Sequence, residues 1–256
     1  MMNILDTFSL AGKKAIVVGG AGDLGVAMVE AVAQAGAQTV IIDFDERVFG
    51  ICDNFKKAGL QVDPIRADVS QRAEITRSYE EALALLGGRV DILINSAGIQ
   101  RRYPSEVFPD EEWSKVIAIN LDATFYYCKH AANTMLQHGG GKIINIASLM
   151  SFLGGITIPA YAASKGGVGQ LTKALSNDWA AKGICVNAIA PGYMDTQLNT
   201  ALINDPVRTA EVMTRVPMKR WGVGADLKGL AVFLASSASD YITGCVIPVD
   251  GGYLAR

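Results

Sequence analysis

Short apolar runs alternate along the whole chain with longer stretches of helical periodicity. Seven of the runs have the length of buried strands: residues 13–18, 38–42, 62–66, 91–94, 142–147, 183–190 and 245–249. Between them, apolar positions recur at the spacing of helices over residues 24–35, 45–58, 71–86, 111–138, the stretch around 161–165, and 225–236. Strands that alternate with helices predict a parallel sheet with right-handed crossovers.

The length and hydrophobic content favour one domain. The chain has 256 residues, half of them hydrophobic, which is enough to bury a full core. We expect a single α/β domain over residues 1–256, with a doubly wound, seven-stranded parallel sheet and helices on both faces. The 111–138 helix is expected to bend near Asn120. Residues 193–217 are expected to form either a mobile flap over the substrate or an ordinary pair of surface helices.

Charge and hydropathy exclude several classes of protein. The net charge is −2 and both signs are mixed throughout, so nothing suggests a surface for nucleic acid or for an anionic membrane. The amino-terminal stretch MMNILDTFSLAGKK has no basic segment followed by an apolar one. No apolar run approaches the roughly 18 residues of a membrane-spanning helix. We therefore expect a soluble, cytoplasmic protein.

The cysteines and histidines do not form a metal-binding pattern. Four widely spaced cysteines without a Cys-x-x-Cys pair favour reduced, mostly buried thiols over a disulfide framework. His130 is two residues after Cys128, but neither histidine belongs to a group of cysteines, histidines or paired carboxylates with the spacing of metal ligands. We expect no metal site, so the chemistry must come from other side chains.

A glycine-rich turn follows the first predicted strand. Gly19-Gly20-Ala21-Gly22-Asp23-Leu24-Gly25 connects this strand to the first predicted helix. Strand, glycine turn and helix form the phosphate cradle of a dinucleotide-binding fold, because glycines let backbone N–H groups approach a pyrophosphate at the positive end of a helix. The alternative is an ordinary tight turn, which also needs glycine.

The second predicted strand ends at Asp43, about 18 residues past Gly25. A carboxylate there can accept hydrogen bonds from an adenosine ribose and would repel a 2′-phosphate. The cofactor is therefore predicted to be NAD rather than NADP. Alternatively, Asp43 caps the helix that follows.

A serine, a tyrosine and a lysine supply the candidate chemistry. Ser148 follows the fifth predicted strand, and Tyr161 and Lys165 are four residues apart on the helix after it, so both can reach one point. A phenol with a pKa near ~10 exchanges protons poorly at neutral pH, and a neighbouring ammonium lowers that pKa. Ser148 would orient the oxygen of a carbonyl or alcohol against the Tyr161 hydroxyl. The trio suits proton transfer coupled to hydride transfer, although Tyr-x-x-x-Lys alone is common on helices.

The segment IQRRYPSEVFPD, residues 99–110, is predicted to be a loop with two adjacent cations, Arg101 and Arg102. They are either a solvated pair of charges or, for one of them, the partner of a substrate carboxylate, which the planar guanidinium fork suits.

Taken together, these residues resemble the short-chain dehydrogenase/reductase family over nearly the whole chain. The matching features are the glycine turn, Asp68-Val69, Asn95-x-Ala97-Gly98, Asn120, Ser148, Tyr161-x-x-x-Lys165, Pro191-Gly192 with Thr196, and Asp250-Gly251-Gly252. The resemblance implies a homotetramer and a catalytic tetrad of Asn120, Ser148, Tyr161 and Lys165, in which Asn120 supports a water-linked proton path through Lys165.

The resemblance also implies the cofactor contacts. They run from the pyrophosphate and adenosine to the nicotinamide ribose and carboxamide, and comprise Gly19, Gly22, Asp23, Leu24, Asp43, Phe44, Asp68, Val69, Asn95, Ala97, Gly98, Tyr161, Lys165, Pro191, Gly192 and Thr196. Within this set, Asp68 and Val69 would flank the adenine and Asn95 would lie beside the sugar.

Three residues depart from the family pattern, which usually has threonine at Val18, asparagine at Ser96 and glycine at Asp23. Asp23 matters most, because two unit charges about 4 Å apart repel by roughly 4 kcal/mol at an effective dielectric constant near 20. We expect its carboxylate to cap a helix that starts at Leu24 and NAD to bind more weakly than it would with glycine there.

A narrower resemblance is to the branch of the family that acts on sugar acids. It rests on ILDTFSLAGK, IQRRYPSEVF, KIINIASLMSFLGGITIPAYAASKGGV, NAIAPGYMDT and FLASSASDYITGCVIPVDGGYLAR. It implies hydride transfer between NAD and a secondary alcohol or ketone of a gluconate-like or deoxy-ketogluconate-like acid. The implied substrate contacts are Arg101, Arg102, Ser148, Met150, Tyr161, Gly192 and Tyr193.

Two other functions stay open at this point. One is a dehydrogenase or reductase of another carbonyl compound: a 3-oxoacyl thioester, a steroid or a neutral polyol. The other is a non-catalytic NAD-binding regulator or scaffold.

Overall fold

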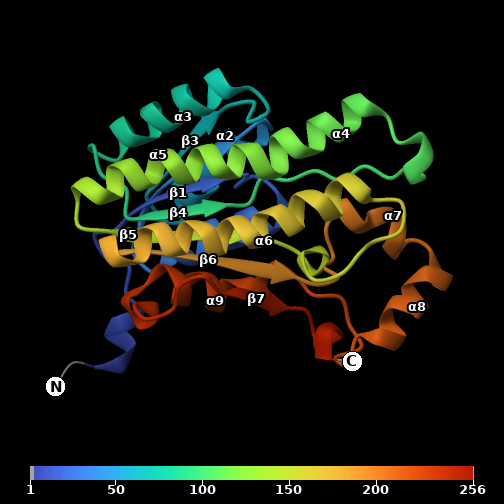
Figure 1. Ribbon diagram of the computed structural model, residues 1–256. Helices are drawn as coiled ribbons and strands as arrows, with labels where there is room; N and C mark the ends of the chain where they lie inside the picture. The colour runs from blue at the N-terminus through green and yellow to red at the C-terminus, as the bar shows by residue number, and fades with distance from the viewer. Residues whose placement is uncertain (1–2, 256) are drawn as a thin grey trace.

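A parallel β-sheet forms the centre of the computed structural model, which describes residues 3–255 (Figure 1). The expected domain, residues 1–256, thus extends beyond the described residues at both ends. In the described part of the chain the sheet has seven strands, all pairing in parallel in the order β3-β2-β1-β4-β5-β6-β7. They are β1 (Lys14–Val18), β2 (Gln38–Asp43), β3 (Val62–Arg66), β4 (Ile92–Asn95), β5 (Gly141–Ile146), β6 (Ile184–Pro191) and β7 (Val246–Val249). The predicted strands are confirmed, each to within one residue at either end.

The strand order reverses beside β1. β2 and β3 lie on one side of β1, and β4 to β7 continue on its other side. In such sheets, ligands bind at the carboxyl ends of the strands where the order reverses. The turn after β1 and the loop after β4 lie at this point, and the candidate site is built from them.

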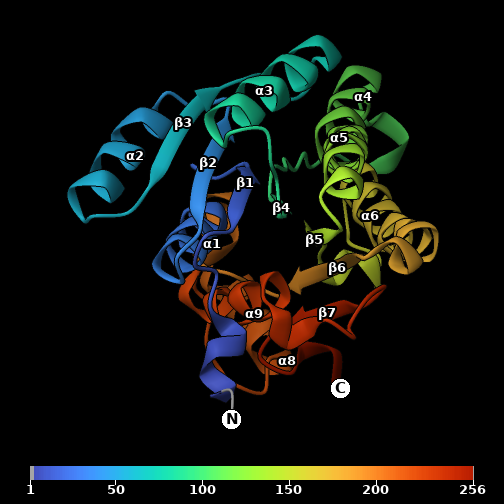
Figure 2. The ribbon, with the colours of Figure 1, turned by 90° about the vertical axis from the view of Figure 1, so that its left-hand side faces the viewer.

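Helices cover both faces of the sheet (Figure 2). One face carries α1 (Asp23–Gln34), α2 (Arg47–Lys57) and α9 (Ala225–Ala235), and the other carries α3 (Arg72–Leu85), α5 (Ala123–Gln137) and α6 (Pro159–Trp179). Because strand side chains alternate between faces, Val17 packs in the first of these cores and Ile16 in the second. The predicted α/β fold with helices on both faces is confirmed.

The long helix predicted over residues 111–138 is broken in the middle. It consists of α4 (Asp110–Ile117), a π-helical turn (Ala118–Asp122) and α5. The interruption falls where the bend near Asn120 was expected. A π turn inserts one extra residue into the helix and redirects the side chains around it, and it often marks a functional site.

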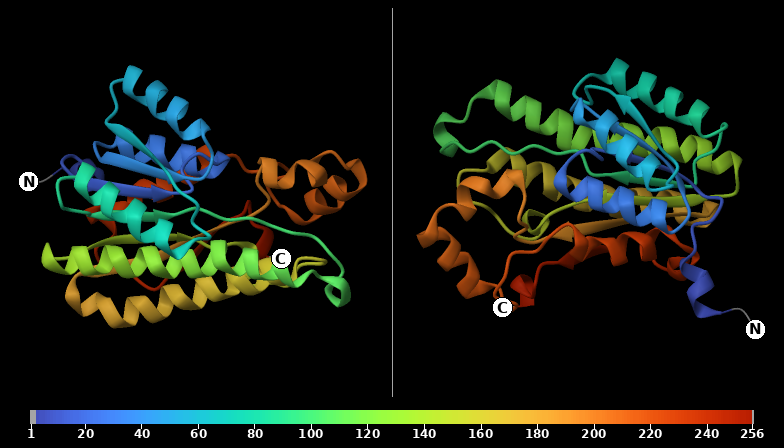
Figure 3. Two further views of the ribbon diagram at one scale, coloured as in Figure 1. Left: turned by 90° about the horizontal axis from the view of Figure 1, so that it is seen from above. Right: turned by 180° about the vertical axis from the view of Figure 1, so that it is seen from behind.

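Residues 193–217 include a pair of short helices, α7 (Thr200–Ile203) and α8 (Pro206–Arg215). The Asp205 carboxylate caps α8 by accepting hydrogen bonds from two N–H groups of its first turn, and Pro206 begins the helix. The pair projects from one end of the sheet (Figure 3). No residue of α8 is buried. It packs instead beside a small apolar cluster centred on Leu149, Val216 and Tyr253.

Two further observations bear on the expectations from the sequence. Among residues 3–255, no helix is both long and apolar enough to cross a membrane. The cysteines are less buried than expected: Cys52 and Cys128 are buried, Cys185 is half-buried and Cys245 is exposed.

Candidate active site

A cavity of about 700 Å³ opens at the carboxyl ends of the strands. Its walls come from the glycine turn, the loop after β4, the end of β5, the start of α6, the end of β6 and α8. Fourteen residues predicted from the sequence line it: Gly19, Gly22, Asp23, Leu24, Gly98, Arg102, Ser148, Met150, Tyr161, Lys165, Pro191, Gly192, Tyr193 and Thr196. The structure thus brings most of the predicted residues to one place.

Backbone segments meet closely at the glycine turn. Gly19 has a φ of +77°, and a Cβ atom there would lie 2.3 Å from the Ala97 backbone nitrogen. A Cβ atom on Gly25 would lie 2.1 Å from the Gly19 carbonyl oxygen. A side chain at either position would collide with the backbone, so both positions require glycine. The first turn of α1 lines the cavity. This cradle fits a pyrophosphate.

Asp23 does not cap the helix as expected. Helix α1 begins at Asp23 itself, and its N-cap is Gly22, which makes no side-chain cap. The Asp23 carboxylate instead accepts a hydrogen bond from the Gln197 backbone N–H at 2.7 Å. The chain after β6 thus returns to the glycine turn and places the Gln197 N–H group beside it. The sequence alone does not predict this contact.

The Asp43 carboxylate lies at the end of β2 and contacts the glycine turn. It accepts hydrogen bonds from the backbone N–H groups of Ala21 at 2.9 Å and Asp45 at 3.0 Å. Helix α2 has Glu46 at its N-cap, so the alternative role of Asp43 as that cap is wrong. Asp43 is positioned beside the cradle but is not part of the cavity wall.

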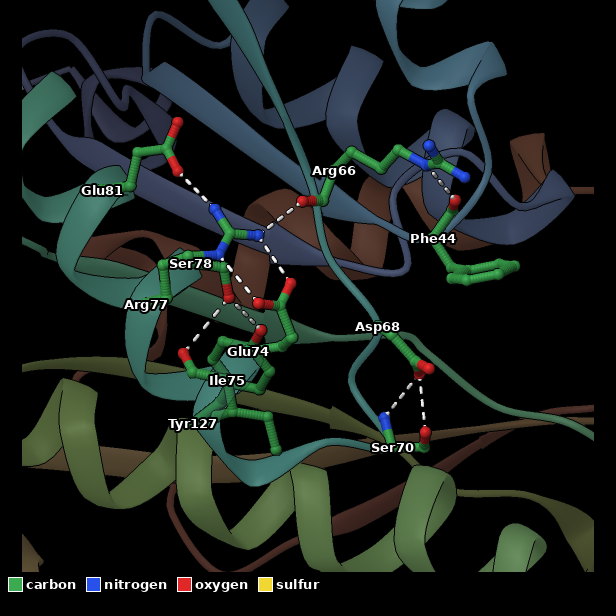
Figure 4. Close-up of polar contacts among 10 residues, drawn as sticks. All are labelled: Phe44, Arg66, Asp68, Ser70, Glu74, Ile75, Arg77, Ser78, Glu81 and Tyr127. Carbon is green, nitrogen blue, oxygen red and sulfur yellow. Dashed lines mark hydrogen bonds and ion pairs between the residues drawn. The ribbon is translucent and has the colours of Figure 1, made fainter.

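Other residues predicted to contact adenosine surround the ends of β2 and β3 (Figure 4). Phe44 is 62 % exposed, and the Arg66 guanidinium lies 5.7 Å from its ring centroid while donating to the Phe44 carbonyl oxygen. Asp68 accepts two hydrogen bonds from Ser70, and Val69 is buried. Arg77 of α3 fixes this region by donating to the Arg66 carbonyl oxygen while it pairs with two glutamates of its own helix.

Lys165 is almost fully buried, at 4 % exposure, and ties α6 to β5. Its ammonium donates a hydrogen bond to the Ile146 carbonyl oxygen at 2.6 Å and lies 5.9 Å from the Tyr161 ring centroid. Ser148 stands two residues past Ile146, where its hydroxyl accepts a hydrogen bond from the Met150 N–H. The three predicted side chains thus meet at the end of β5.

The pKa shifts of these groups differ from the expectation. Burial raises the pKa of the Tyr161 hydroxyl, and the opposing effects of a hydrogen bond with Ser148 and of the Arg102 charge are smaller. Burial also lowers the pKa of Lys165 to about 8. A net lowering of the Tyr161 pKa by Lys165 is therefore wrong for this structure, because desolvation of the phenol outweighs the charges around it.

Asn120 is buried behind Lys165. Its side-chain amide accepts from the Ile99 N–H at 2.8 Å and donates to the Ile99 carbonyl oxygen and the Ser164 hydroxyl. A Cβ atom on Gly98 would lie 3.5 Å from the Lys165 Nζ and 3.6 Å from the Asn120 Oδ1, so both side chains approach Gly98. The π turn thus delivers Asn120 to the Lys165 end of the site, although it does not line the cavity.

Asn95 does not lie at the cavity as expected. Its side chain is 4 % exposed and points into the core, where its Nδ2 donates to the Asn145 Oδ1 at 2.9 Å and to the Cys128 Sγ at 3.3 Å. Asn95 and Asn145 are directly paired in the register of β4 and β5. A contact between the Asn95 side chain and the sugar is therefore wrong, while a contact through the Asn95 backbone stays a prediction.

Arg101 and Arg102 point to different places. Arg101 forms an ion pair with Glu112 of α4 at 2.6 Å and is not part of the cavity wall. Arg102 lines the cavity, and burial together with the charge of Arg208 lowers its pKa. Of the two candidate partners for a substrate carboxylate, the structure places only Arg102 beside Ser148 and Tyr161.

Comparison with known proteins identifies the family of the chain. A family model described as enoyl-(acyl carrier protein) reductase matches residues 19–254. The chain belongs to the short-chain dehydrogenase/reductase family. It is 44 % identical to the 2-dehydro-3-deoxy-D-gluconate 5-dehydrogenase of Escherichia coli over 254 residues, which is 99 % of this chain and 100 % of that one. It is also 40 % identical to the 5-keto-D-gluconate 5-reductase of Escherichia coli over 97 % of this chain and 98 % of that one.

A solved structure is similar throughout. The gluconate 5-dehydrogenase from Burkholderia cenocepacia, in complex with NADP and tartrate, is 40 % identical with a TM-score of 0.95, covering 99 % of this chain and 100 % of that one. The predicted membership of the short-chain dehydrogenase/reductase family is confirmed, and so is the resemblance to enzymes with sugar-acid names.

Several residues of the cavity wall were not predicted from the sequence. Four of them lie on one face of α8: Arg208, Glu211, Val212 and Arg215. Their spacing of three, four and seven residues is the signal that could have found them, since such positions share one side of a helix. Gln197 and Tyr253 also line the cavity and come from the chain after β6 and from the last turn.

We predict that Gly25→Ala destabilises the protein, whereas Gly22→Ala does not. The new methyl group at Gly25 would lie 2.1 Å from the Gly19 carbonyl oxygen, and the nearest atom at Gly22 is 3.6 Å away. Forcing a methyl into such a contact costs roughly 1–3 kcal/mol. Urea unfolding of both variants measures the difference in the free energy of unfolding. Equal values would contradict the prediction, because they would show that the turn accommodates the methyl group at Gly25.

Proposed function

We propose that this short-chain dehydrogenase/reductase moves a hydride between a nicotinamide cofactor and a secondary alcohol or ketone of a sugar acid. The observation that carries the proposal is a single cavity that holds Ser148, Tyr161, Lys165 and the cation Arg102 beside a glycine cradle. The relatives named 2-dehydro-3-deoxy-D-gluconate 5-dehydrogenase and 5-keto-D-gluconate 5-reductase support a substrate of this class. The homotetramer implied by the family, the single domain over residues 1–256 and the cytoplasmic location stay predictions.

The proposed roles follow from position and charge. The bound cofactor supplies the hydride chemistry. Tyr161 exchanges the proton of the substrate oxygen, and Ser148 donates a hydrogen bond to the same oxygen. A phenol with a raised pKa holds its proton at neutral pH, which suits the donor in the reduction of a ketone. Lys165, with a pKa of about 8, is mostly charged at pH 7 and stabilises negative charge that develops on Tyr161.

Asn120 completes the proposed tetrad from outside the cavity. Its amide is held by both polar backbone atoms of Ile99, and it approaches the same glycine as the Lys165 ammonium. In this position it can anchor a proton path that leads away from Lys165. The proposed contacts with the cofactor are the glycine turn, the loop after β4, Pro191, Gly192 and Thr196, all of which border the cavity.

The cofactor is proposed to be NAD. Asp43 presents a carboxylate beside the glycine turn, where it would repel a 2′-phosphate. Arg66, opposite Asp43 in the register of β2 and β3, is paired with Glu46, and Arg47, four residues after Asp43, is paired with Asp45. The Burkholderia cenocepacia relative is in complex with NADP, so the proposed preference of this chain for NAD rests on the Asp43 carboxylate alone.

The function is tested by the rate of NADH formation with purified protein against sugar acids, matched neutral sugars, steroids and aliphatic alcohols. We expect turnover of a sugar acid and much slower turnover of its neutral counterpart, because Arg102 pairs with the carboxylate. Activity confined to neutral or lipophilic alcohols would refute the sugar-acid assignment. NADH formation with a 3-hydroxyacyl thioester, added to the same panel, would favour the 3-oxoacyl alternative.

Tyr161→Phe separates an enzyme from a non-catalytic NAD-binding protein. Removing the hydroxyl is expected to lower kcat by roughly 100- to 10,000-fold, which is the usual effect of a positioned general acid. NAD binding, followed by fluorescence titration, should change little because the ring remains. A variant with undiminished turnover would contradict the role of Tyr161.

Asp43→Asn tests the cofactor preference. The substitution keeps an oxygen that can accept from the Ala21 and Asp45 N–H groups and removes the negative charge. We expect the ratio of kcat/KM for NAD to that for NADP to fall by about 10-fold, equivalent to ~1.4 kcal/mol. An unchanged ratio, or wild-type protein that prefers NADP, would show that Asp43 does not set the preference.

Asp23→Asn and Asp23→Gly test whether the charge at the cradle weakens NAD binding. Asparagine retains an acceptor for the Gln197 N–H, and glycine removes both the charge and the hydrogen bond. Both variants are expected to bind NAD about 3- to 10-fold more tightly, because a carboxylate near the pyrophosphate repels it. Dissociation constants equal to that of the wild type would refute the idea. Tighter binding by the glycine variant alone would assign the effect to the Gln197 contact.

A further inference from the structure

The arginines that lack a carboxylate partner are concentrated in one place. Six arginines in residues 3–255 form ion pairs with aspartate or glutamate. The other four do not, and three of those line the candidate active site: Arg102, Arg208 and Arg215. Most arginines of the described residues form ion pairs with carboxylates, and these three differ because they form none.

The surroundings differ among the three. The Arg215 guanidinium stacks over the Tyr253 ring, 4.4 Å from its centroid. Arg102 donates one hydrogen bond, to the Gln100 Oε1 at 3.3 Å. In the described part of the chain, the Arg208 side chain forms no hydrogen bond or ion pair, and the Asp205 carboxylate accepts from the Arg208 backbone N–H instead. Arg215 is thus positioned against an aromatic ring, whereas Arg102 and Arg208 stack on no ring of the described residues and keep most of their N–H donors free.

These two arginines come from different parts of the fold. Arg102 lies in the loop before α4, and Arg208 lies in the first turn of α8. Both segments flank the same end of the sheet (Figures 1 and 3). The charge of Arg208 acts on Arg102 and helps to lower the pKa of its guanidinium. The two cations repel each other across the cavity that also holds Ser148 and Tyr161.

Other charges facing the cavity do not cancel this repulsion. Asp23 is engaged with the Gln197 N–H, and Glu211 forms no ion pair within 4 Å in the described residues. The cavity wall thus carries four cations, Arg102, Lys165, Arg208 and Arg215, against two carboxylates. A ligand carboxylate between two guanidiniums would relieve the repulsion, and each of its oxygens could accept from a different arginine.

We propose that Arg208 is a specificity-determining residue, which with Arg102 holds the substrate carboxylate from two sides. This inference rests on the proposed function, because it assigns the acid group of the sugar acid to this pair. Helix α8 has no buried residue and contacts a small apolar cluster, so it is held to the body of the protein by few interactions. The substrate carboxylate then bridges α8 to the loop before α4 and closes the cavity over the reacting carbon.

The inference is tested with Arg208→Ala, Arg102→Ala, the double variant and Arg101→Ala as the matched control. Arg101 has the same charge, is adjacent to Arg102 and lies outside the cavity in its pair with Glu112. For a sugar acid, we expect Arg208→Ala to lower kcat/KM by roughly 10- to 100-fold, mainly through KM. A matched neutral sugar should show less than about 3-fold change, and so should Arg101→Ala with either substrate.

The double variant examines whether the two arginines share one group. Because both bind the same carboxylate, the combined loss should be smaller than the product of the two single losses. Arg208→Lys keeps the charge but not the fork and should recover only part of the activity. The dissociation constant for NAD should stay that of the wild type in all five variants.

The possible outcomes separate this inference from the proposed function. Turnover of sugar acids that is unaffected by Arg208→Ala, or equal losses with acid and neutral sugar, would overturn the role of Arg208 alone. If the protein turns over no sugar acid, calorimetric titration with gluconate in the presence of NAD measures whether the carboxylate site binds an acid. Binding that depends on Arg208 would then support the carboxylate site while refuting sugar-acid turnover. An absence of both turnover and gluconate binding would overturn both proposals.

Discussion

The hydrogen bond from the buried Lys165 ammonium to the Ile146 carbonyl oxygen fixes the relation between α6 and β5. Burying an ammonium is costly unless it has partners, and the cost appears here as a pKa lowered to about 8. The bond sets how far along β5 the helix sits. Tyr161, one turn earlier on α6, and Ser148, two residues past Ile146, consequently meet in one cavity. The geometry of the reacting groups thus depends on a structural contact as much as on the groups themselves.

The hydrogen bond from Lys165 to Ile146 also explains why the pKa values of Tyr161 and Lys165 are not those of a simple ion pair. Lys165 directs its ammonium at a backbone carbonyl oxygen and lies 5.9 Å from the Tyr161 ring centroid. At that distance in a desolvated site, burial dominates the pKa of each group and moves the two values in opposite directions. The phenol keeps its proton and the lysine holds its own less firmly. Substrate and cofactor charges then act on a site in which Lys165 is hydrogen-bonded to a backbone carbonyl oxygen and is paired with no carboxylate of the described residues.

The sequence predicted what short-range pattern determines. Apolar runs placed all seven strands to within one residue, and the spacing of Tyr161 and Lys165 placed both on one side of a helix. The glycine turn was predictable because close backbone approach leaves no room for a side chain at Gly19 or Gly25. Even the interruption near Asn120 carried a signal, since the helical pattern there was longer than its neighbours.

The features that were missed depend on contacts between distant parts of the chain. Asp23 accepts from Gln197, which is 174 residues away, so the local pattern suggested a helix cap instead. Asn95 pairs with Asn145 because β4 and β5 are in register, which directs its side chain into the core. Arg101 and Arg102 are adjacent, and the ion pair of Arg101 with Glu112 of α4 holds it away from the cavity that Arg102 lines.

The sheet and the outer segments contribute different groups to the candidate site. The strand ends, the glycine turn and α6 hold the groups that exchange the proton and cradle the cofactor, and all of them are anchored in the two large cores. The arginines proposed to bind the acid group come from the loop before α4 and from α8, which lie outside those cores. Under this proposal, substitutions in these outer segments can alter the choice of substrate without disturbing the packing that aligns Ser148, Tyr161 and Lys165. The choice of substrate and the alignment of the reacting groups would then be set by separate parts of the fold.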